Sequence, residues 1–268
     1  MSKKNNSLFS ALLKFWRGQR GMSQLDLALA SDVSSRHISF LETGRAQPSE
    51  EMILRIATTL SVPLRNQNEM LRAAGFDQRF DEPDLNREMP TEIKRALDAI
   101  LSVNNPYPIM VMNETYDILR VNHATQRLLA YFVADPNRMS AGLNAYRLLF
   151  DPGLARPYVV DWPQMAQKLL SRLHRESLNA PGNPGFKALL DDLLTYPEIP
   201  SAWRYPNFDL PAEPVYLIHL KNGEIEASFL TTVTMFSAPG NITLEELRIE
   251  TYFPLDDKTD ALCRGFAD

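Results

Sequence analysis

The residues most suited to chemistry lie between Met22 and Ser49, in the stretch MSQLDLALASDVSSRHISFLETGRAQPS. Polar and charged side chains follow two short helical runs, which are separated by a polar turn at residues 31–34. Two helices joined by such a turn can place the second helix in the major groove of DNA, where its first side chains reach base edges. The N-terminus of the first helix can bind a phosphate, because its free N–H groups and the helix dipole attract an anion. This spacing predicts a helix-turn-helix that reads double-stranded DNA.

Helix signals divide this end of the chain into five expected helices. Leucine and aromatic residues recur with helical spacing from Leu8 to Trp16, before glycines at positions 18 and 21. Serine is a preferred N-cap, and it stands at the start of the second, third and fourth runs. In the second run, Leu25, Ala28 and Leu29 are expected to face the core. The four later helices are expected at residues 24–30, 35–43, 50–60 and 63–74.

This stretch resembles the lambda-repressor-like, or XRE-type, helix-turn-helix. The usual shape of that family is S-Q-x-x-L-A, a turn, V-S, and then I-S-x-x-E-x-G-x-x-x-P, and the sequence from Ser23 to Pro48 keeps this spacing. The departure is Asp32, at a turn position where glycine or another small residue is commoner. The resemblance implies an all-α, five-helix DNA-binding domain over residues 1–76.

The resemblance also assigns DNA contacts to eight side chains. Gln24 would bond a phosphate, and Arg36 would make a bidentate contact to a guanine, which gives roughly 1–3 kcal/mol of discrimination. Phe40 cannot donate a hydrogen bond, so it would touch a thymine methyl group. Glu42 is expected to bond an arginine or the backbone inside the domain. The candidate DNA-binding residues are Gln24, Ser34, Ser35, Arg36, His37, Ser39, Phe40 and Arg45, although outside the motif they would read as surface charges, caps or packing residues.

Charge is distributed unevenly along the chain. Residues 1–79 hold 11 Lys and Arg against 7 Asp and Glu, a net charge of +4, which leaves 28 − 11 = 17 basic and 33 − 7 = 26 acidic residues, or −9, for the rest. The overall charge of −5 argues against a nucleic-acid partner. A basic first part joined to an acidic second part fits a chain of which only the first part contacts a polyanion, although so small a difference also arises by chance.

The pattern changes after a polar, proline-containing segment at 77–90, which is expected to be a linker. A helix is expected at 91–103, and the runs YPIMVMN and YDILRVN then predict a β-hairpin, followed by a helix at 124–132. Helical patterns follow, and VYLIHL, EIEASFLTTVTMFSA and ELRIETYFP predict three final strands, the first two joined by an Asn-Gly turn. This order predicts an α+β domain at 91–268, with an antiparallel sheet and helices against one side.

Motifs of the common enzyme classes do not occur in the sequence. The four histidines are not in HExxH or another metal-ligand spacing, and no G-x-S-x-G, GxxxxGK[ST] or GxGxxG pattern occurs. Cys263, the one cysteine, has no partner nearby in sequence that would make it a nucleophile. No apolar run reaches 18 residues, and the N-terminus is not typical of a signal peptide. We expect a protein that is not an enzyme, in a reducing cytoplasm and without a membrane partner.

The second part of the chain resembles two related domains. The run PIMVMNETYDILRVNHATQRLL is similar to the opening of a PAS domain, in which a hairpin and an asparagine precede a short helix. Together with NAYRLLFDP, ARPYVVDWPQMAQKLLSRLHRE, FKALLDDLLTYPEIPSAWR and TMFSAPGNITLEELRIETYFP, it resembles the ligand-binding domain of MmyB-like regulators. The resemblance implies a bacterial transcription regulator whose PAS-like domain holds an apolar small molecule such as a fatty acid. No cofactor is required for this function.

A pocket in such a domain needs apolar and aromatic lining with few polar anchors. The expected elements offer these side chains, and methionine suits an adaptable lining. Arg147 is the candidate partner for a ligand carboxylate, although a helical arginine is commonly a surface residue. The other candidates also fit an ordinary core, and the sequence does not say which sheet face points at the pocket. The candidate ligand-binding residues are Met110, Met112, Leu128, Phe132, Arg147, Trp162, Met165, Phe229, Thr231, Met235 and Tyr252.

Several alternatives stay open at this point. His123, beside Asn122, is a candidate haem ligand, whereas light-sensing flavin chemistry lacks the cysteine it needs. The second domain could instead be a ligand-free dimerisation or protein-interaction module, and an enzyme fused to a DNA-binding head is the third class. The leading hypothesis is a small-molecule-controlled regulator that acts as a homodimer. One helix-turn-helix makes few base contacts, and two half-sites about 34 Å apart recover affinity and specificity.

Overall fold

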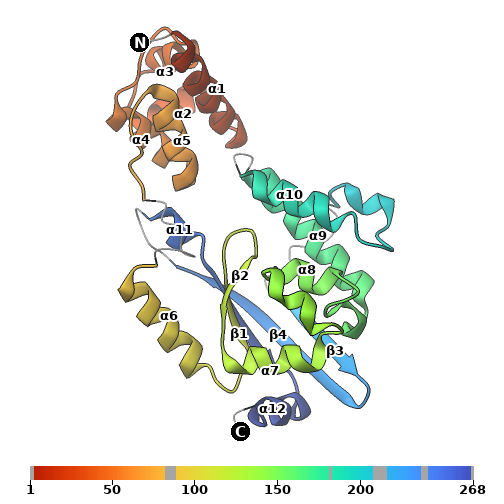
Figure 1. Cartoon of the computed structure of the whole chain (residues 1–268). Helices are drawn as coiled ribbons and strands as arrows, with labels where there is room; N and C mark the ends of the chain where they lie inside the picture. The colour runs from red at the N-terminus through yellow and green to blue at the C-terminus, as the bar shows by residue number, and fades with distance from the viewer. Residues whose placement is uncertain (1–2, 82–88, 181–182, 208–215, 237–240, 267–268) are drawn as a thin grey trace. The chain divides into compact units, whose positions relative to one another are not determined.

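Two units make up the chain in the computed structural model (Figure 1). The first unit runs from Met1 to Pro83 and includes a later segment at 238–245, and the second unit comprises the remaining residues. Of the predicted linker, 77–90, residues 82–88 lie outside the described part of the chain. The residues that the structure describes are 3–81, 89–180, 183–207, 216–236 and 241–266.

The first unit contains the five predicted helices and one short helix from the later segment. This short helix, α11 (Ile242–Glu245), joins the unit through the N–H of Ile242, which donates to the carbonyl oxygen of Asp81 at 3.0 Å. The predicted all-α domain is confirmed. The five helices are α1 (Lys3–Gln19), α2 (Gln24–Ser31), α3 (Ser35–Glu42), α4 (Glu50–Thr59) and α5 (Leu64–Ala74).

Local hydrogen bonds explain where α2 begins and ends. The hydroxyl of Ser23 accepts from the N–H of Asp26 at 3.1 Å, and the Asp26 carboxylate accepts from the N–H of Ser23 at 2.8 Å, which is a capping box. The helix ends at Asp32, which has φ +54° and whose N–H bonds the carbonyl of Ala28. The family's usual glycine or small residue suits this left-handed position, and Asp is among the few other residues that tolerate it. The predicted turn is therefore present despite the unusual residue.

The residues that α2 buries in the core of the first unit differ from those predicted. Leu27 and Ala28 are buried, whereas Leu25 and Leu29 are 57% and 75% exposed. The expectation that Leu25 and Leu29 face the core was wrong, because the five apolar residues of this eight-residue helix are spread around it and their spacing does not single out one face. The core residues with no exposed surface are Phe9, Leu13, Leu27, Ile38, Leu41, Ile53, Ile56, Ala57, Leu60, Met70 and Leu71.

The second unit is built on a five-stranded antiparallel sheet, which confirms the predicted fold class. Both predicted hairpins are present, and the second turns at Gly223 with φ +60°, a conformation that glycine adopts without strain. The strand order is β2-β1-β5-β4-β3. The strands are β1 (Ile109–Met112), β2 (Ile118–Val121), β3 (Tyr216–Asn222), β4 (Ile225–Met235) and β5 (Arg248–Pro254).

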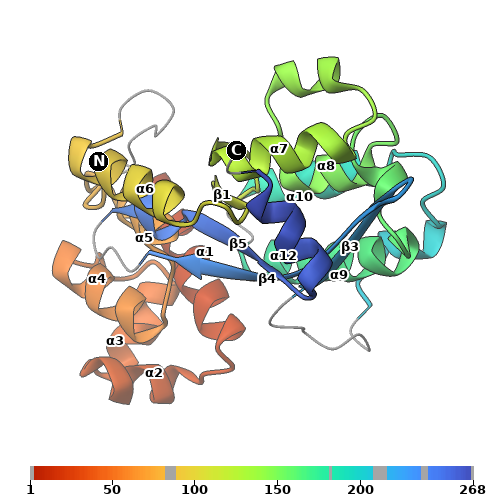
Figure 2. The ribbon, with the colours of Figure 1, turned by 90° about the horizontal axis from the view of Figure 1, so that it is seen from below.

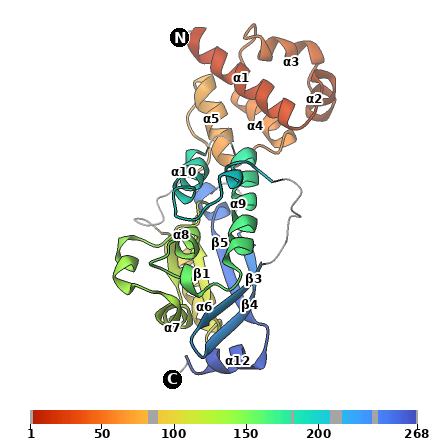
Figure 3. The same cartoon turned by 90° about the vertical axis from the view of Figure 1, so that its right-hand side faces the viewer.

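Helices surround this sheet, and three of them lie together on one side of it (Figures 1 and 3). These are α8 (Ala145–Phe150), α9 (Trp162–Asn179) and α10 (Pro184–Leu193). The predicted loop at 179–185 is shorter, since α10 begins at Pro184, and residues 181–182 lie outside the described part. The other elements are α6 (Thr91–Val103), α7 (His123–Phe132), α12 (Asp257–Arg264) and the 3-10 turns Pro136–Ala141, Arg156–Tyr158 and Ser201–Arg204.

Strand register decides which side chains share a sheet face. Glu250 lies opposite Met110 on β1 and opposite Val233 on β4, and Thr231 lies opposite Tyr252 and Tyr216. Side chains of paired residues point to the same side of a sheet, and alternate residues of one strand share that side. Together with the Ile218 and Phe229 pair, these residues therefore form one face, and it packs against α8 and α9 in the main core of the unit.

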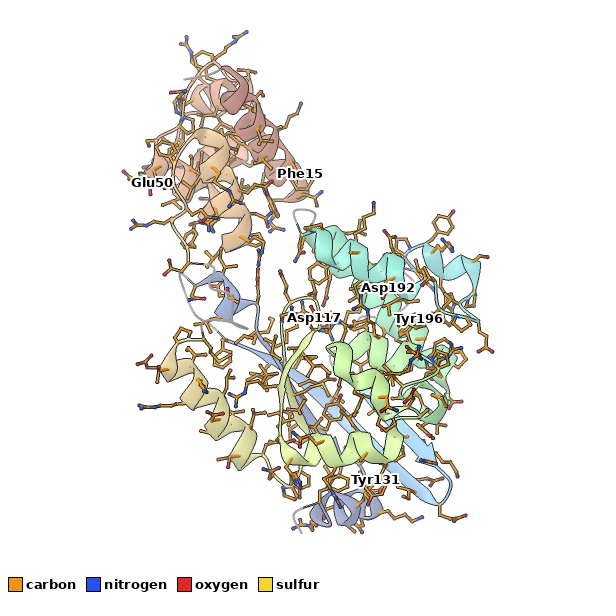
Figure 4. All side chains as sticks on the ribbon, in the orientation of Figure 1. Phe15, Glu50, Asp117, Tyr131, Asp192 and Tyr196 are labelled. Carbon is orange, nitrogen blue, oxygen red and sulfur yellow. The ribbon has the colours of Figure 1, made fainter. Side chains whose placement is uncertain are left out.

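Helix α6 lies on part of the opposite face of the sheet, and α12 packs at the end of β5, where Cys263 and Phe266 join the main core. The guanidinium of Arg120 on β2 forms an ion pair with Asp98 on α6. The N–H of Ser228 on β4 donates to the hydroxyl of Thr259 on α12 at 2.9 Å, and Figure 2 shows α12 against β4 and β5. The ring of Tyr131 on α7, labelled in Figure 4, stacks on the ring of Phe266, which follows α12. The face of the sheet that packs against α8 and α9 is therefore distinct from the face that meets α6.

Candidate functional sites

A buried carboxylate holds α2 and α3 in place in the first unit. Arg17 on α1 donates to Glu42 on α3 through Nε at 2.6 Å and Nη2 at 3.1 Å, and Gln24 Nε2 donates to the same carboxylate at 2.8 Å. The Glu42 side chain is 4% exposed. Burial opposes ionisation, but the hydrogen bonds from Arg17 and Gln24 outweigh it and lower the pKa of Glu42. Glu42 therefore has the structural role predicted for it, and it orients Gln24 at the start of α2.

Helix α3 presents an accessible polar face beside this cluster. The guanidinium of Arg36 lies over the ring of Phe40, 5.2 Å from its centroid, whereas Ile38 and Leu41 on the other face are fully buried. An arginine held over an aromatic ring is partly oriented before any partner binds. The DNA contacts stay a prediction. Of the eight candidates, Ser34, Ser35, Arg36 and Arg45 are exposed, and Gln24, His37, Ser39 and Phe40 are partly exposed.

The second unit contains a cavity of about 50 Å³ on the side of the sheet that faces α8 and α9. One water molecule needs roughly 10–15 Å³, so the cavity is larger than a single water site. Most of its walls are apolar or aromatic, as in small-molecule sites. The lining residues are Met110, Tyr116, Ala145, Tyr146, Leu148, Leu149, Met165, Leu169, Arg172, Tyr216, Ile218, Val233, Glu250 and Tyr252.

Helical spacing explains how α9 supplies an arginine to this wall. Met165, Leu169 and Arg172 follow each other at intervals of four and three residues, so they share one face of the helix. The two apolar residues of this set are buried, and Arg172 continues their row toward the polar end of the cavity. The guanidinium of Arg172 lies 5.6 Å from the ring centroid of Tyr216 and 5.8 Å from that of Tyr116. The helix therefore places a cation among aromatic rings.

One carboxylate at this end is shared by two arginines. Nε of Arg172 donates to Glu176 Oε1 at 3.0 Å, and Nη1 of Arg248 donates to Oε1 at 3.1 Å and Oε2 at 3.2 Å. The hydroxyl of Tyr116 lies 2.8 and 2.7 Å from the same two oxygens. The guanidinium of Arg248 also lies near two rings, 4.3 Å from the centroid of Tyr116 and 5.9 Å from that of Phe186. Helix α9, strand β5 and the turn between β1 and β2 therefore meet at Glu176.

Three further polar groups face the same cavity. Burial raises the pKa of the Glu250 carboxyl and of the Tyr116 and Tyr146 hydroxyls. The Tyr146 hydroxyl is buried and has no hydrogen-bond partner among the described residues. Tyr116 has φ +67°, a strained conformation for a residue other than glycine, and such strain is common at functional sites. The cavity thus combines apolar walls with a small set of polar groups at one end.

The candidate ligand-binding residues occupy four settings. Met110, Met165 and Tyr252 line the cavity. Arg147 does not line it, because its Nε donates to Asp192 at 2.7 Å in a partly exposed ion pair of α8 and α10 (Figure 4 labels Asp192). Met235 shares the sheet face but lies at its end, where it is 65% exposed. The remaining candidates are buried in the surrounding core without lining the cavity, namely Met112, Leu128, Phe132, Trp162, Phe229 and Thr231.

Sequence reasoning missed most of the polar groups of the cavity. Arg172 could have been found, because it continues the apolar row of an amphipathic helix instead of its polar face. Glu250 carries the weaker signal of an acidic residue at an inward position of a strand. The three tyrosines Tyr116, Tyr146 and Tyr216 carry no signal that separates them from ordinary core residues.

Other reactive side chains lie away from this cavity. His123, the candidate haem ligand, is exposed at the first residue of α7. Cys263 is fully buried, and burial raises its pKa to about 12, so its thiol is unreactive at neutral pH. Within the described ranges, no cluster of three or more His, Cys, Asp or Glu side chains is arranged to hold a metal ion. None of the helices in that part of the chain is long and apolar enough to span a membrane.

Comparison with known families gives two matches. A model described as "Helix-turn-helix" matches residues 13–66, and one described as "MmyB-like transcription regulator ligand binding domain" matches residues 93–264, which is more than half of the chain. The first match contains α2, α3 and the Glu42 carboxylate. The second contains the sheet, the cavity and its arginines.

Comparison with individual proteins adds less. No curated protein was found to match the chain. A solved structure described as "Structure of an RNA-binding Light-Oxygen-Voltage Receptor" is 13% identical, with an alignment that covers 95% of this chain and 55% of that chain at a TM-score of 0.31. The chain therefore spans about half the length of that receptor, and a likeness this low supports no conclusion on fold or function.

Proposed function

The chain belongs to the MmyB-like transcription regulators, and from this premise we propose that it is a dimeric, sequence-specific regulator whose second unit binds an apolar small molecule. A fatty acid is the leading candidate for that molecule. The helix-turn-helix and the ligand-binding domain support a DNA-binding regulator with a ligand-binding domain. The identity of the ligand, the dimer and a cytoplasmic location are parts of the proposal, and the proposal assigns the chain no catalytic reaction.

The cavity carries the ligand part of this proposal. It lies between sheet and helices, and its walls are mainly apolar and aromatic. Its polar side chains Tyr116, Tyr146 and Tyr216 lie close to Arg172, which suits a molecule with one polar group. At about 50 Å³ it is smaller than a long acyl chain. A fatty acid would therefore require movement of flexible lining side chains such as Met110 and Met165, and methionine adapts readily to such a change.

Native mass spectrometry of the purified protein tests the dimer and the ligand together. The spectrum gives the oligomeric mass, and comparison with a spectrum after denaturing organic extraction gives any bound mass. We expect a dimer that carries a mass in the range of a fatty acid. An empty protein that also takes up no added fatty acid would contradict the ligand part, and a monomer at all concentrations would contradict the dimer.

A cavity-filling variant shows whether a bound mass occupies this cavity. Ala145 on α8 lines the cavity, so Ala145→Phe should fill it and remove the bound mass. Ala99→Phe is the matched control, because Ala99 is exposed on α6. Circular dichroism confirms that both variants fold. Bound mass that persists in Ala145→Phe would place the ligand elsewhere.

An exposed apolar row favours a second candidate function, in which the second unit contacts proteins and binds no ligand. Leu217, Leu230 and Phe253 lie opposite each other on three adjacent strands, on the sheet face away from the cavity. Leu217 is 60% exposed and Phe253 is 46% exposed. Apolar side chains gathered on a surface often mark contact sites. An empty cavity together with loss of the dimer in Leu217→Glu would favour this function over ligand binding.

A further inference from the structure

The charges at the polar end of the cavity do not balance. Arg172 and Arg248 contribute two positive charges, and Glu176, the carboxylate they share, contributes one negative charge. Glu250 also lines the cavity, where burial raises its pKa, and no ion pair among the described residues joins it to Arg172 or Arg248. A buried or partly buried charge without a full partner is unfavourable, so an added anion would stabilise this end of the cavity.

Arg172 is the arginine that can reach a ligand. It lines the cavity, whereas Glu176 and Arg248 do not. Its Nε bonds Glu176, and no other described residue accepts a hydrogen bond from its two terminal nitrogens. An arginine with its terminal nitrogens free can hold a carboxylate through two parallel hydrogen bonds. Arg172 is therefore suited to bind an anion inside the cavity.

A second donor points to the same ligand group. Tyr146 lines the cavity, and its hydroxyl is buried and lacks a partner within the described part of the chain. Leaving a buried hydroxyl without a hydrogen bond is costly, so such groups commonly await a water or a ligand. The ring of Tyr146 lies 4.4 Å from that of Tyr116, which itself lies under the guanidinium of Arg248. The unpartnered hydroxyl is thus part of the same polar end.

We propose that this end of the cavity is an anion subsite for an amphiphile with one negative charge, whose anionic group binds the terminal nitrogens of Arg172 and competes with Glu176 for this arginine. The ligand anion accepts hydrogen bonds from Arg172 and from the hydroxyl of Tyr146. The inference rests on the proposed function, since it names the ligand class for the same cavity. It replaces Arg147 by Arg172 as the partner of the ligand's charged group.

Binding of the ligand's anionic group to Arg172 leaves no group of the protein without a partner. When Arg172 turns to the ligand, Glu176 keeps both hydrogen bonds from Arg248 and the one from Tyr116. A carboxylate that keeps an arginine and a phenol stays compensated. Glu176 therefore competes with the ligand for Arg172, and the strength of this competition sets the affinity for an anion.

Isothermal titration calorimetry with decanoate and decan-1-ol tests the subsite in the full-length protein at neutral pH. The two probes have the same chain length and differ in charge. We expect wild type to bind decanoate about tenfold or more tightly than decan-1-ol, because charge-assisted hydrogen bonds are the stronger ones. Arg172→Gln should remove this preference and keep the binding of decan-1-ol. Arg147→Gln, which breaks a surface ion pair outside the cavity, is the matched control and should keep the preference.

Glu176→Gln distinguishes competition between Glu176 and the ligand from a purely structural role of Glu176. The amide keeps the shape of the carboxylate but competes less for Arg172, so decanoate should bind several-fold more tightly than to wild type, with decan-1-ol unchanged. A structural role alone predicts weaker binding of both probes. Thermal unfolding of each variant reports folding, and the wild-type and Glu176→Gln comparison is sufficient if Arg172→Gln does not fold.

The outcomes separate this inference from the proposed function. Equal binding of decanoate and decan-1-ol by wild type would overturn the anion subsite and keep an apolar pocket. Loss of the preference in Arg147→Gln but not in Arg172→Gln would also overturn it. Binding of neither probe would contradict the proposed ligand-binding function itself, and the subsite with it.

Discussion

Each unit of this protein holds a partly or fully buried carboxylate against arginine, and the two clusters differ in how their charges balance. In the first unit, Glu42 binds one arginine, Arg17, together with a neutral amide. In the second unit, Glu176 binds two arginines, Arg172 and Arg248, together with a phenol. We call these the Glu42 cluster and the Glu176 cluster. The first is balanced, and the second has one positive charge in excess.

The surroundings of the two clusters show why this difference matters. The Glu42 cluster ties α1, α2 and α3 together inside a helical domain, so its partners are all protein groups. The Glu176 cluster stands beside a cavity, and one of its arginines forms part of the cavity wall. The same residue types thus stabilise a fixed arrangement in one unit and leave a charge available in the other. The balance of charge and access to a cavity, more than residue type, separate the two roles.

The largest effect is expected from Glu42→Ala. This change leaves Arg17 without its partner in a site where the two side chains are 4% and 16% exposed, so the first unit should lose about 3–5 kcal/mol of stability. Hydrogen exchange at the amides of α1 to α3 measures this loss separately from the second unit. The matched control is Glu51→Ala, which breaks an exposed ion pair and should cost less than about 1 kcal/mol. Equal losses in the two variants would show that burial of the pair is not what stabilises the unit.

The next largest effect is expected from removing a helix N-cap residue in each unit. Asn122 is buried, and its side chain accepts from Thr125 N–H at 2.9 Å, accepts from Ile109 N–H at 3.3 Å and donates to the carbonyl of Tyr107 at 2.8 Å. Asn122→Ala should therefore destabilise the second unit by about 2–3 kcal/mol, because it leaves several buried groups unbonded. Ser34→Ala removes one exposed cap bond in the first unit and should cost about 1 kcal/mol or less. Urea unfolding measures both, and a larger loss in Ser34→Ala would contradict this ranking.

Substitution of Arg36 tests the first unit as the part that reads DNA. Arg36→Ala should reduce discrimination between a selected operator and random DNA by about 1–3 kcal/mol, while nonspecific affinity changes less. Fluorescence anisotropy with the two duplexes at one salt concentration gives the ratio. The matched control is Arg55→Ala, an exposed arginine on α4 that lies outside the predicted contacts and should keep the ratio. An unchanged ratio in Arg36→Ala would remove Arg36 from the base contacts.

The smallest effects concern pH, and the two units should respond in opposite directions. The pKa of Glu42 is lowered in the folded protein, so its stabilising contribution is present above its ordinary pKa and is lost as the pH falls through the lower folded value. The pKa of Glu250 is raised by burial, so its contribution is most favourable below its ordinary pKa and is lost as the pH rises through the higher folded value. Hydrogen exchange of each unit between about pH 2 and pH 7.5 covers both ranges and separates these trends.

Neutral amide variants assign the pH trends to the two side chains. Glu250→Gln should stabilise the second unit at neutral pH and flatten its pH dependence, because no buried carboxyl then has to ionise. Glu42→Gln should flatten the acid loss of the first unit and lower its stability at neutral pH. Unchanged pH profiles in both variants would show that other groups govern the trends.

Prediction from sequence succeeded where the signals are local. The caps at Ser23, Ser34 and Ser49 and the Asn-Gly turn before β4 each act within a few residues, so the helices and hairpins were placed correctly. Prediction failed for Leu25 and Leu29, which are exposed, because the apolar residues of α2 are spread around the helix and do not mark one face. Only the packing of α2 against its neighbours decides which of those side chains is buried.

The cavity shows the limit of sequence more clearly. Glu176 and Arg248 meet although they are 72 residues apart in the sequence. Arg172 reaches the cavity only because the packing of α9 against the sheet turns that side of the helix toward the cavity. The candidate anchor Arg147 has the same residue type and lies on a neighbouring helix, yet it pairs with Asp192 at the surface. Helical spacing places Arg172 in the apolar row of α9, but only the packing of distant segments shows that this row borders a cavity.

The sequence by itself determined the local elements of this protein, the helix-turn-helix and its family, and the alternation that makes each strand two-sided. These depend on hydrogen bonds and periodicity over a few residues, which the chain carries wherever it folds. Only the tertiary structure decided which sheet face meets α8 and α9, which arginine borders the cavity, and that two guanidiniums share Glu176. These depend on strand register and helix packing between distant segments, where a shift of one residue would turn every side chain to the other face.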